Sequence, residues 1–168
     1  MAGIDGERRL AARTVVACAG FLLGVLWMDL MFDVQGLGHP GAPAPLPEAV
    51  LASIAGYYRR VTTDASPMGV LIGVVMMLGI LAASAQAWRT PGPLWRRLLP
   101  VALLAGPIVL ALARVFPDAI RLGARLGAPD EQSALARSIC RAHLACFASV
   151  GAALVGQLRT NLLGLGIG

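Results

Sequence analysis

Four apolar segments of this chain are each long enough to cross a membrane as a helix. They cover residues 14–33, 67–88, 98–116 and 138–158. A helix needs about 20 predominantly apolar residues to cross about 30 Å of hydrocarbon. Charged residues make up only 14% of the chain, against about a quarter in soluble domains. These segments predict an all-α fold, a four-transmembrane-helix bundle in which residues 1–168 form a single integral membrane domain.

The stretch between the first two spans predicts a helix that does not cross the membrane. Residues 34–47 are rich in glycine and proline, which is typical of a loop. Residues 47–61 then place apolar side chains at helical spacing and end near Arg59 and Arg60. We therefore expect a short external amphipathic helix between helices 1 and 2, which lies on the membrane surface or caps the bundle.

The basic residues predict how the chain is oriented. All 14 are arginines, and most flank the apolar segments, which favours anchoring at a membrane surface over binding to nucleic acid. The two sides carry equal numbers of arginines, but the short N-terminal stretch and the turn at residues 89–97 concentrate them. Because arginines in short loops mark the cytoplasmic side, we expect cytoplasmic N- and C-termini in a bacterial-type inner (plasma) membrane.

Ionisable residues from three spans fall at one predicted depth. Counted from the nearest arginine at the cytoplasmic end of each span, Asp29, Arg114, Arg141 and His143 lie about 24–27 Å along the helix axis. Asp33 lies one turn beyond Asp29 on the same helix face. Ionisable groups inside a membrane are costly, pair with one another and often mark a functional site.

This layer predicts a polar pocket that opens outward, with the external helix as its lid. His143 would act as a general base that Asp29 orients, and an arginine would stabilise an oxyanion. The predicted catalytic residues are His143, Asp29 and Arg141, and the predicted ligand-binding residues are Asp33, Tyr57, Tyr58 and Arg114.

Other interpretations of the layer remain open. The charged groups could simply lie at the interface, where arginine reaches the headgroups. A proton or ion path is a third interpretation, but the inner halves of the spans are apolar. Cys140, His143 and Cys146 extend over about 9 Å of one helix, so they cannot enclose a single ion or form a disulfide. A metal held by Asp29, Asp33 and His143 is possible, but we expect neither a metal nor a cofactor.

Three short motifs carry a resemblance to a known family. They are Tyr57-Tyr58-Arg59-Arg60 in the external helix, Ser66-Pro67-Met68 at the start of the second span, and Arg141-Ala142-His143 in the fourth. Their layout resembles the anthrone oxygenase-like family of small four-helix membrane proteins. The resemblance implies the four-helix fold and, as for a few members, oxidation of polycyclic anthrones to quinones with O₂ and without metal or flavin.

Two functional hypotheses follow. In the first, the protein binds, or oxidises, a small apolar molecule in its polar pocket. In the second, it is a non-catalytic accessory subunit or scaffold of a larger membrane complex. Small-residue stripes that allow close helix packing, such as Gly20-x-x-x-Gly24 and Gly69-x-x-x-Gly73, support the second hypothesis. Whether the protein is an enzyme is left open, and the expected partners are the lipid bilayer, an apolar ligand or other membrane subunits.

Overall fold

The structure, a computed structural model, describes residues 2–37 and 45–165. Within these ranges the chain is helical and contains no strand. The elements are α1 (Ala2–Asp33), the 3-10 turn η1 (Val34–Gly36), α2 (Glu48–Thr62), α3 (Ser66–Arg89), α4 (Leu94–Leu110), the π turn η2 (Ala111–Val115), α5 (Phe116–Gly123) and α6 (Pro129–Leu165). Residues 38–44 of the predicted loop lie outside the described residues.

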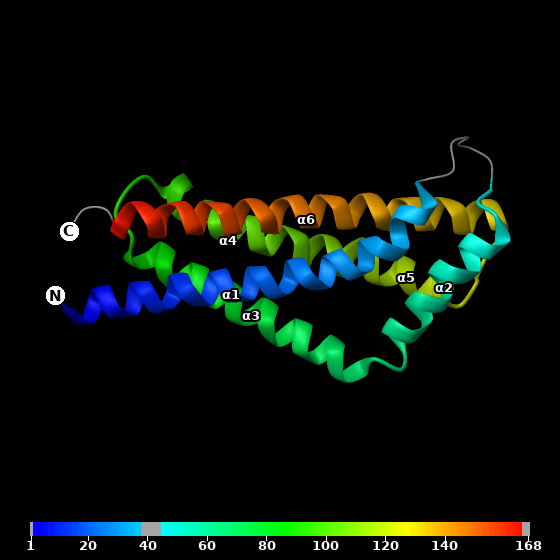
Figure 1. The fold of residues 1–168 in the computed structure, drawn as a ribbon, viewed down its shortest axis with the longest axis horizontal. Coiled ribbons are helices and arrows are strands. Elements are labelled where there is room, and N and C mark those ends of the chain that lie inside the picture. Colours follow the sequence, from blue (N-terminus) through cyan, green and yellow to red (C-terminus); the bar gives the residue numbers. More distant parts are fainter. Residues whose placement is uncertain (1, 38–44, 166–168) are drawn as a thin grey trace.

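The four long helices form an up-and-down bundle. Helix α1 packs against α3 and α6, and α4 packs against the same two helices from the other side. The start of α1, the α3–α4 connection and the end of α6 lie at one end, called here the termini end (Figure 1). Helices α2 and α5 lie at the opposite end, called the α2 end. Four helices are long and apolar enough to cross a membrane, so the prediction of an all-α protein with four such helices is confirmed.

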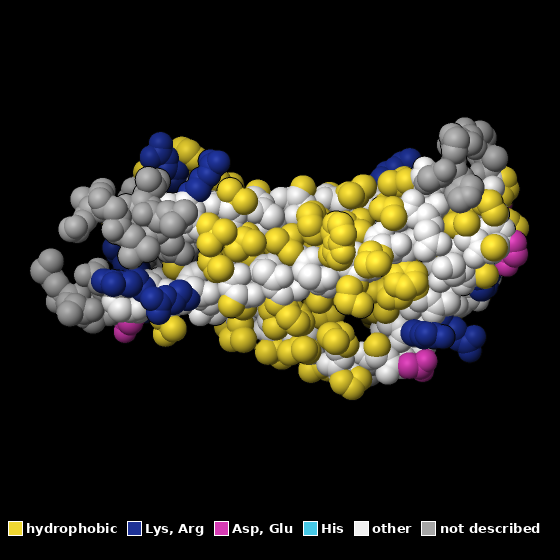
Figure 2. Space-filling model, viewed as in Figure 1, with side chains coloured by type: hydrophobic (Ala, Val, Ile, Leu, Met, Phe, Trp, Pro, Cys, Tyr) yellow, Lys and Arg dark blue, Asp and Glu magenta, His cyan; other side chains and the backbone are white. Residues whose placement is uncertain are grey.

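The surface of the bundle is apolar in the middle and charged towards its ends. Figure 2 shows hydrophobic side chains over the central part of one face and arginines and acids near the two ends. Only 11% of the most apolar stretch of α3 is buried inside the protein. This helix therefore presents most of its apolar side chains outward, as a helix in contact with lipid does.

Helix α2 is packed into the body of the protein. Its buried residues Leu51, Ile54, Ala55 and Tyr58 follow helical spacing and form one face. That face packs against buried side chains of α5 and the start of α6 and forms a hydrophobic cluster separate from the core of the four-helix bundle. The amphipathic pattern of residues 47–61 thus marks the face by which α2 attaches to α5 and α6.

The predicted third span contains an interior proline, and a neighbouring helix makes up for its missing N–H. Pro107 cannot donate to the carbonyl of Leu103, four residues earlier. The hydroxyl of Ser149 on α6 donates to this carbonyl instead, at 2.8 Å. A side chain from a packed neighbour is one way in which a membrane helix tolerates proline.

Removing the Ser149 hydroxyl should therefore lower the free energy of unfolding by more when Pro107 is present than when Pro107 is replaced. Ser149→Ala is expected to lower the free energy of unfolding by about 1 kcal/mol. In a Pro107→Ala background the restored N–H can bond to Leu103, and the same change should cost less than half as much. Equilibrium unfolding in mild detergent, arranged as a double-mutant cycle, measures the difference. Equal costs in the two backgrounds would contradict this account.

The third long helix continues beyond residue 116, where the predicted span ends. After the π turn η2 the chain runs on through α5 to Gly123, although Pro117 lies in the first turn of α5. A π turn is wider than an α turn, so it relieves the clash between a proline ring and the carbonyl four residues earlier. The helix thus reaches far enough for α2 to pack on it.

Candidate functional site

Two aspartates and two tyrosines pair between α1 and α2. The hydroxyl of Tyr57 donates to Oδ1 of Asp29 at 2.5 Å, and that of Tyr58 donates to Oδ1 of Asp33 at 2.6 Å. Asp29 and Asp33 lie on one face of α1 because they are four residues apart. The ring of Tyr57 also stacks on Phe32, with 4.2 Å between the ring centroids. Each acid on this face therefore has a phenol donor from α2.

His143 of α6 completes this cluster. Its Nδ1 lies 2.6 Å from Oδ2 of Asp33, which is completely buried and also accepts the Tyr58 hydrogen bond. An acceptor at this position keeps the proton of a neutral imidazole on Nδ1 and leaves the lone pair on Nε2. Nε2 lies 4.0 Å from Oδ2 of Asp29. This separation is too long for a direct hydrogen bond, but one oxygen atom between the two groups could bond to both.

The tyrosines remain protonated in this environment. Burial raises the pKa of Tyr57 well above its usual 10.0, and the hydrogen bond to Asp29 raises it further. Burial also raises the pKa of Tyr58, with a second contribution from the charge of Asp33. Both hydroxyls are therefore donors at neutral pH, and the two carboxylates are their acceptors.

A cavity of about 330 Å³ adjoins the cluster. Its polar end contains Asp29, Tyr58 and His143, and most of its remaining wall is apolar. Figure 2 shows the surface hollowed between α3 and the rest of the bundle near α2. The remaining lining residues are Leu22, Val25, Leu26, Val61, Thr62, Gly69, Ile72, Gly73, Met76, Leu104, Pro107, Ile108, Ala111, Leu112, Val115, Phe116, Ala119, Cys146 and Val150. An apolar cleft with a few convergent polar groups is typical of a ligand-binding site.

Two glycines of α3 keep this cavity open. Gly69 and Gly73 both line it, and a Cβ atom added to either residue would meet nothing within 4 Å. Their spacing was expected to bring a neighbouring helix close, but the space beside them is empty. The glycine pair is the sequence signal that marks this wall, although its spacing by itself indicates close helix packing.

The structure brings five of the seven predicted site residues together and leaves two outside. Asp29, Asp33, Tyr57, Tyr58 and His143 form the cluster. Arg114 on η2 and Arg141 on α6 are exposed. Among the described residues, neither arginine makes an ion pair with Asp29 or Asp33. The acids are satisfied by phenol and imidazole groups, so the cluster differs from the layer of acids and arginines expected from depth alone.

The metal-ligating residue types do not gather into a binding site. Over the described parts of the chain, no group of three or more histidines, cysteines and acids is placed to hold a metal ion. Cys18, Cys140 and Cys146 are free and buried. The thiol of Cys146 is 3.8 Å from the carbonyl oxygen of Pro107, which places it beside α4.

Comparison of this chain with models of protein families, with characterised proteins and with solved structures gives no match.

Proposed function

We propose that the protein is a multi-pass membrane protein that binds a small, mostly apolar molecule with one hydrogen-bonding oxygen. The observation that carries this proposal is the apolar cavity that ends on Asp29, Tyr58 and His143. The apolar wall would take the body of the ligand, and the polar end would select for its oxygen.

The size of the cavity narrows the class of ligand. A protein cavity of about 150 Å³ is large enough to hold benzene. The present cavity, at about 330 Å³, has room for an aromatic molecule of two or three fused rings. Such a molecule partitions into a membrane, and α3, which leaves most of its apolar side chains exposed, forms one wall of the cavity. The ligand would therefore enter from the hydrocarbon.

The polar end could position and deprotonate a hydroxyl group. An oxygen placed between Nε2 of His143 and Asp29 would lie within hydrogen-bonding distance of both, since these groups are 4.0 Å apart. Nε2 would accept the ligand's proton, and Asp33 would stabilise the imidazolium through Nδ1. Arg114 and Arg141 take no part in this proposal because both are exposed.

The resemblance to the anthrone oxygenase-like family extends the proposal to an oxidation. In that reaction an anthrone loses a proton from its CH₂ group to the base, and the resulting anion reacts with O₂ and takes the proton back to give a quinone and water. His143 would be the base for the first step, and O₂ would be the oxidant. Binding without turnover remains the core of the proposal, since the apolar cavity and its polar end support binding directly.

The alternative of an accessory subunit has less support. The small residues Gly69 and Gly73 on α3 line the cavity near the cluster, and Ala152 and Gly156 on α6 line a second cavity at the termini end. Both stripes are exposed and border cavities, so a partner helix packed on them would have to cover or fill those cavities. Gly20-x-x-x-Gly24 on α1 is also exposed with open space beside it, and it lines neither cavity.

The proposed orientation follows the arginines. The start of α1 and the turn at residues 89–97 hold six arginines, and Arg159 near the end of α6 is a seventh at the termini end, which is typical of a cytoplasmic face. In this proposal the protein lies in a bacterial-type inner membrane, and its termini end faces the cytoplasm. The α2 end, with its cluster and cavity, would then face outward, with α2 outside the hydrocarbon.

A pair of matched ligands tests the proposal. We expect 1-naphthol to bind the protein in lipid nanodiscs about tenfold more tightly than naphthalene, because only naphthol can bond to the polar end. His143→Leu should abolish this preference while naphthalene still binds. Gly73→Leu should lower the affinity for both ligands by about tenfold, because the leucine side chain fills the cavity without touching the cluster. Ligand fluorescence, with empty nanodiscs as the blank, measures both affinities.

Gly20→Leu is the matched control, since Gly20 also has open space beside it but lines neither cavity. It should leave both affinities unchanged. If naphthol and naphthalene bind equally to the wild type, or if Gly73→Leu has no more effect than Gly20→Leu, the proposed site is wrong.

A further inference from the structure

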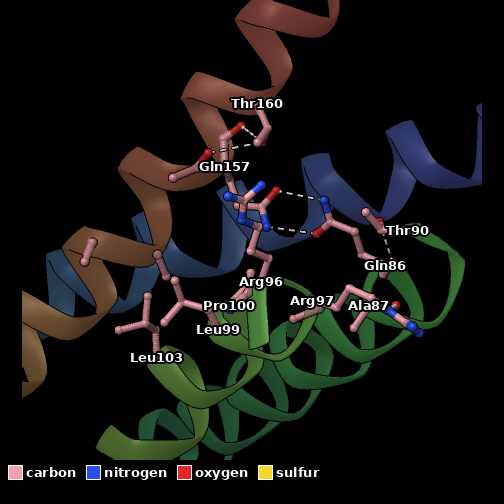
Figure 3. A pocket seen from close by; sticks show the side chains of 14 residues that line it. Gln86, Ala87, Thr90, Arg96, Arg97, Leu99, Pro100, Leu103, Gln157 and Thr160 are labelled. Atoms are coloured by element: carbon pink, nitrogen blue, oxygen red, sulfur yellow. Dashed lines mark hydrogen bonds between the residues drawn. The ribbon is translucent and has the colours of Figure 1, made fainter. Parts of the chain in front are cut away.

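A second cavity lies at the termini end, far from the aspartate–histidine cluster. It has a volume of about 250 Å³ and is bounded by α3, α4 and α6. Its polar lining consists of Gln86, Thr90, Arg96, Arg97, Gln157 and Thr160 (Figure 3). The lining contains no acid. The function proposed above makes no use of this cavity.

The floor of the cavity is a pair of glutamine side chains. Gln86 of α3 and Gln157 of α6 donate to each other's carbonyl oxygens, at 3.1 and 2.8 Å, as the two parallel dashed lines in Figure 3 show. Gln157 is buried. This reciprocal amide pair ties α3 to α6, so the separation of the two helices beside the cavity is set without a ligand.

The cavity carries two arginines with unused donors. Arg97 donates from Nε to the carbonyl oxygen of Ala87 at 2.6 Å, which holds its guanidinium group against the last turn of α3. Arg96 makes no hydrogen bond or ion pair within the described part of the chain, and its guanidinium lies 5.0 Å from the ring centroid of Trp95. At this end of the bundle Glu7 forms an ion pair with Arg89, with 3.1 Å between Oε2 and Nη2. The charge of Arg96 and Arg97 is therefore not offset by an acid and favours an anion.

The surroundings of the cavity favour an anion attached to an apolar tail. Leu99, Pro100 and Leu103 form an apolar wall beside the arginines. Trp88 and Trp95 nearby are 83% and 63% exposed. Exposed tryptophans at the ends of membrane-length helices lie at the level of the lipid headgroups. The arginines would meet a phosphate group at this level, and the apolar wall would meet the start of an acyl chain.

We propose that this cavity binds the phosphate group of an anionic phospholipid through Arg96 and Arg97. The guanidinium fork matches phosphate oxygens and bonds to them with charge-assisted hydrogen bonds. Basic pockets between membrane helices on the cytoplasmic side are suited to such headgroups. A free phosphate ion offers the same chemistry but would leave the apolar wall without a partner.

Native mass spectrometry of the detergent-purified protein tests this proposal. After incubation with equal amounts of dioleoylphosphatidylglycerol and dioleoylphosphatidylcholine, the wild type should retain the anionic lipid about tenfold better. The Arg96→Gln/Arg97→Gln variant should lose this preference. Ala152→Leu, which fills the apolar side of the cavity and keeps both arginines, should also lower retention of the anionic lipid.

Arg59→Gln/Arg60→Gln removes two exposed arginines from α2 and serves as the control. It should keep the preference. A preference that survives in Arg96→Gln/Arg97→Gln, or that disappears equally in the control, would overturn the proposal. Millimolar inorganic phosphate should not displace the lipid, and complete displacement would identify free phosphate as the ligand and overturn the lipid assignment.

Discussion

Replacing Asp33 by asparagine is expected to lower the free energy of unfolding by about 2–4 kcal/mol. Asp33 is completely buried and accepts hydrogen bonds from both Tyr58 and His143. Tyr58 and His143 bond to different oxygens of Asp33, and asparagine keeps an oxygen at only one of these two positions, so its NH₂ group faces the other donor. The buried donor that loses its acceptor then bears the cost of its desolvation.

Two comparisons make this result specific to Asp33. Asp29→Asn should lower the free energy of unfolding by clearly less, because the Asp29 side chain is partly accessible and accepts a hydrogen bond from Tyr57 alone. Asp64→Asn, at an exposed position after α2, should change stability by less than about 0.5 kcal/mol. Equilibrium unfolding in mild detergent, followed by circular dichroism, gives the three values. If Asp33→Asn were as stable as Asp64→Asn, the buried carboxylate would not hold the cluster together.

The double variant Asp33→Asn/Tyr58→Phe sharpens this experiment. Tyr58→Phe removes one of the two donors, so the amide oxygen of asparagine can then accept the hydrogen bond from His143. The cost of the double variant should therefore be smaller than the sum of the two single costs by about 1 kcal/mol or more. Simple additivity would show that Tyr58 and Asp33 act independently.

Gly123→Ala should displace α2 from the bundle. A Cβ atom at Gly123 would lie 2.8 Å from the backbone nitrogen of Arg59 and 3.2 Å from the carbonyl carbon of Tyr58. These are backbone atoms, so no side chain can turn aside to make room. We expect the variant to lose about 1–3 kcal/mol through overpacking, and more if the tyrosine–aspartate hydrogen bonds are also broken.

Gly56→Ala is the matched control because it lies on α2 itself. Gly56 is exposed, and a Cβ atom there would meet nothing within 4 Å. The change should stabilise α2 by about 0.5–1 kcal/mol, since glycine is unfavourable inside a helix. Thermal unfolding and the near-ultraviolet circular dichroism of the tyrosines follow both variants. A stable Gly123→Ala protein with unchanged tyrosine signals would contradict the close contact between α2 and α5.

The sequence predicted the helices well because their signals are local. Each apolar segment is long enough to cross a membrane whatever surrounds it, and the observed helices contain the predicted ranges 14–33, 67–88 and 138–158. The apolar spacing in residues 47–61 likewise predicted α2 and its buried face. The third helix extended to Gly123 because a π turn accommodates Pro117, and no residue pattern marks such a turn.

The count along the helices also put Asp29 and His143 level with each other, and Nε2 of His143 lies 4.0 Å from Oδ2 of Asp29. Depth depends only on the number of residues from a helix end, at about 1.5 Å each. The same count put Arg114 and Arg141 at this level, but both are exposed, and within the described residues neither forms an ion pair with the acids. Each residue turns a helix by about 100°, so residues at one depth can face opposite sides.

The sequence by itself therefore determined the all-α class, the four membrane-length helices, the amphipathic α2 and the level of the ionisable residues. Only the tertiary structure decided that Tyr57 and Tyr58 are the partners of Asp29 and Asp33, and that Gly69 and Gly73 border a cavity. Helix length and apolar content are properties of one segment. The partner of a buried carboxylate and the space beside a glycine depend on the rotation and tilt of several helices, which packing alone sets.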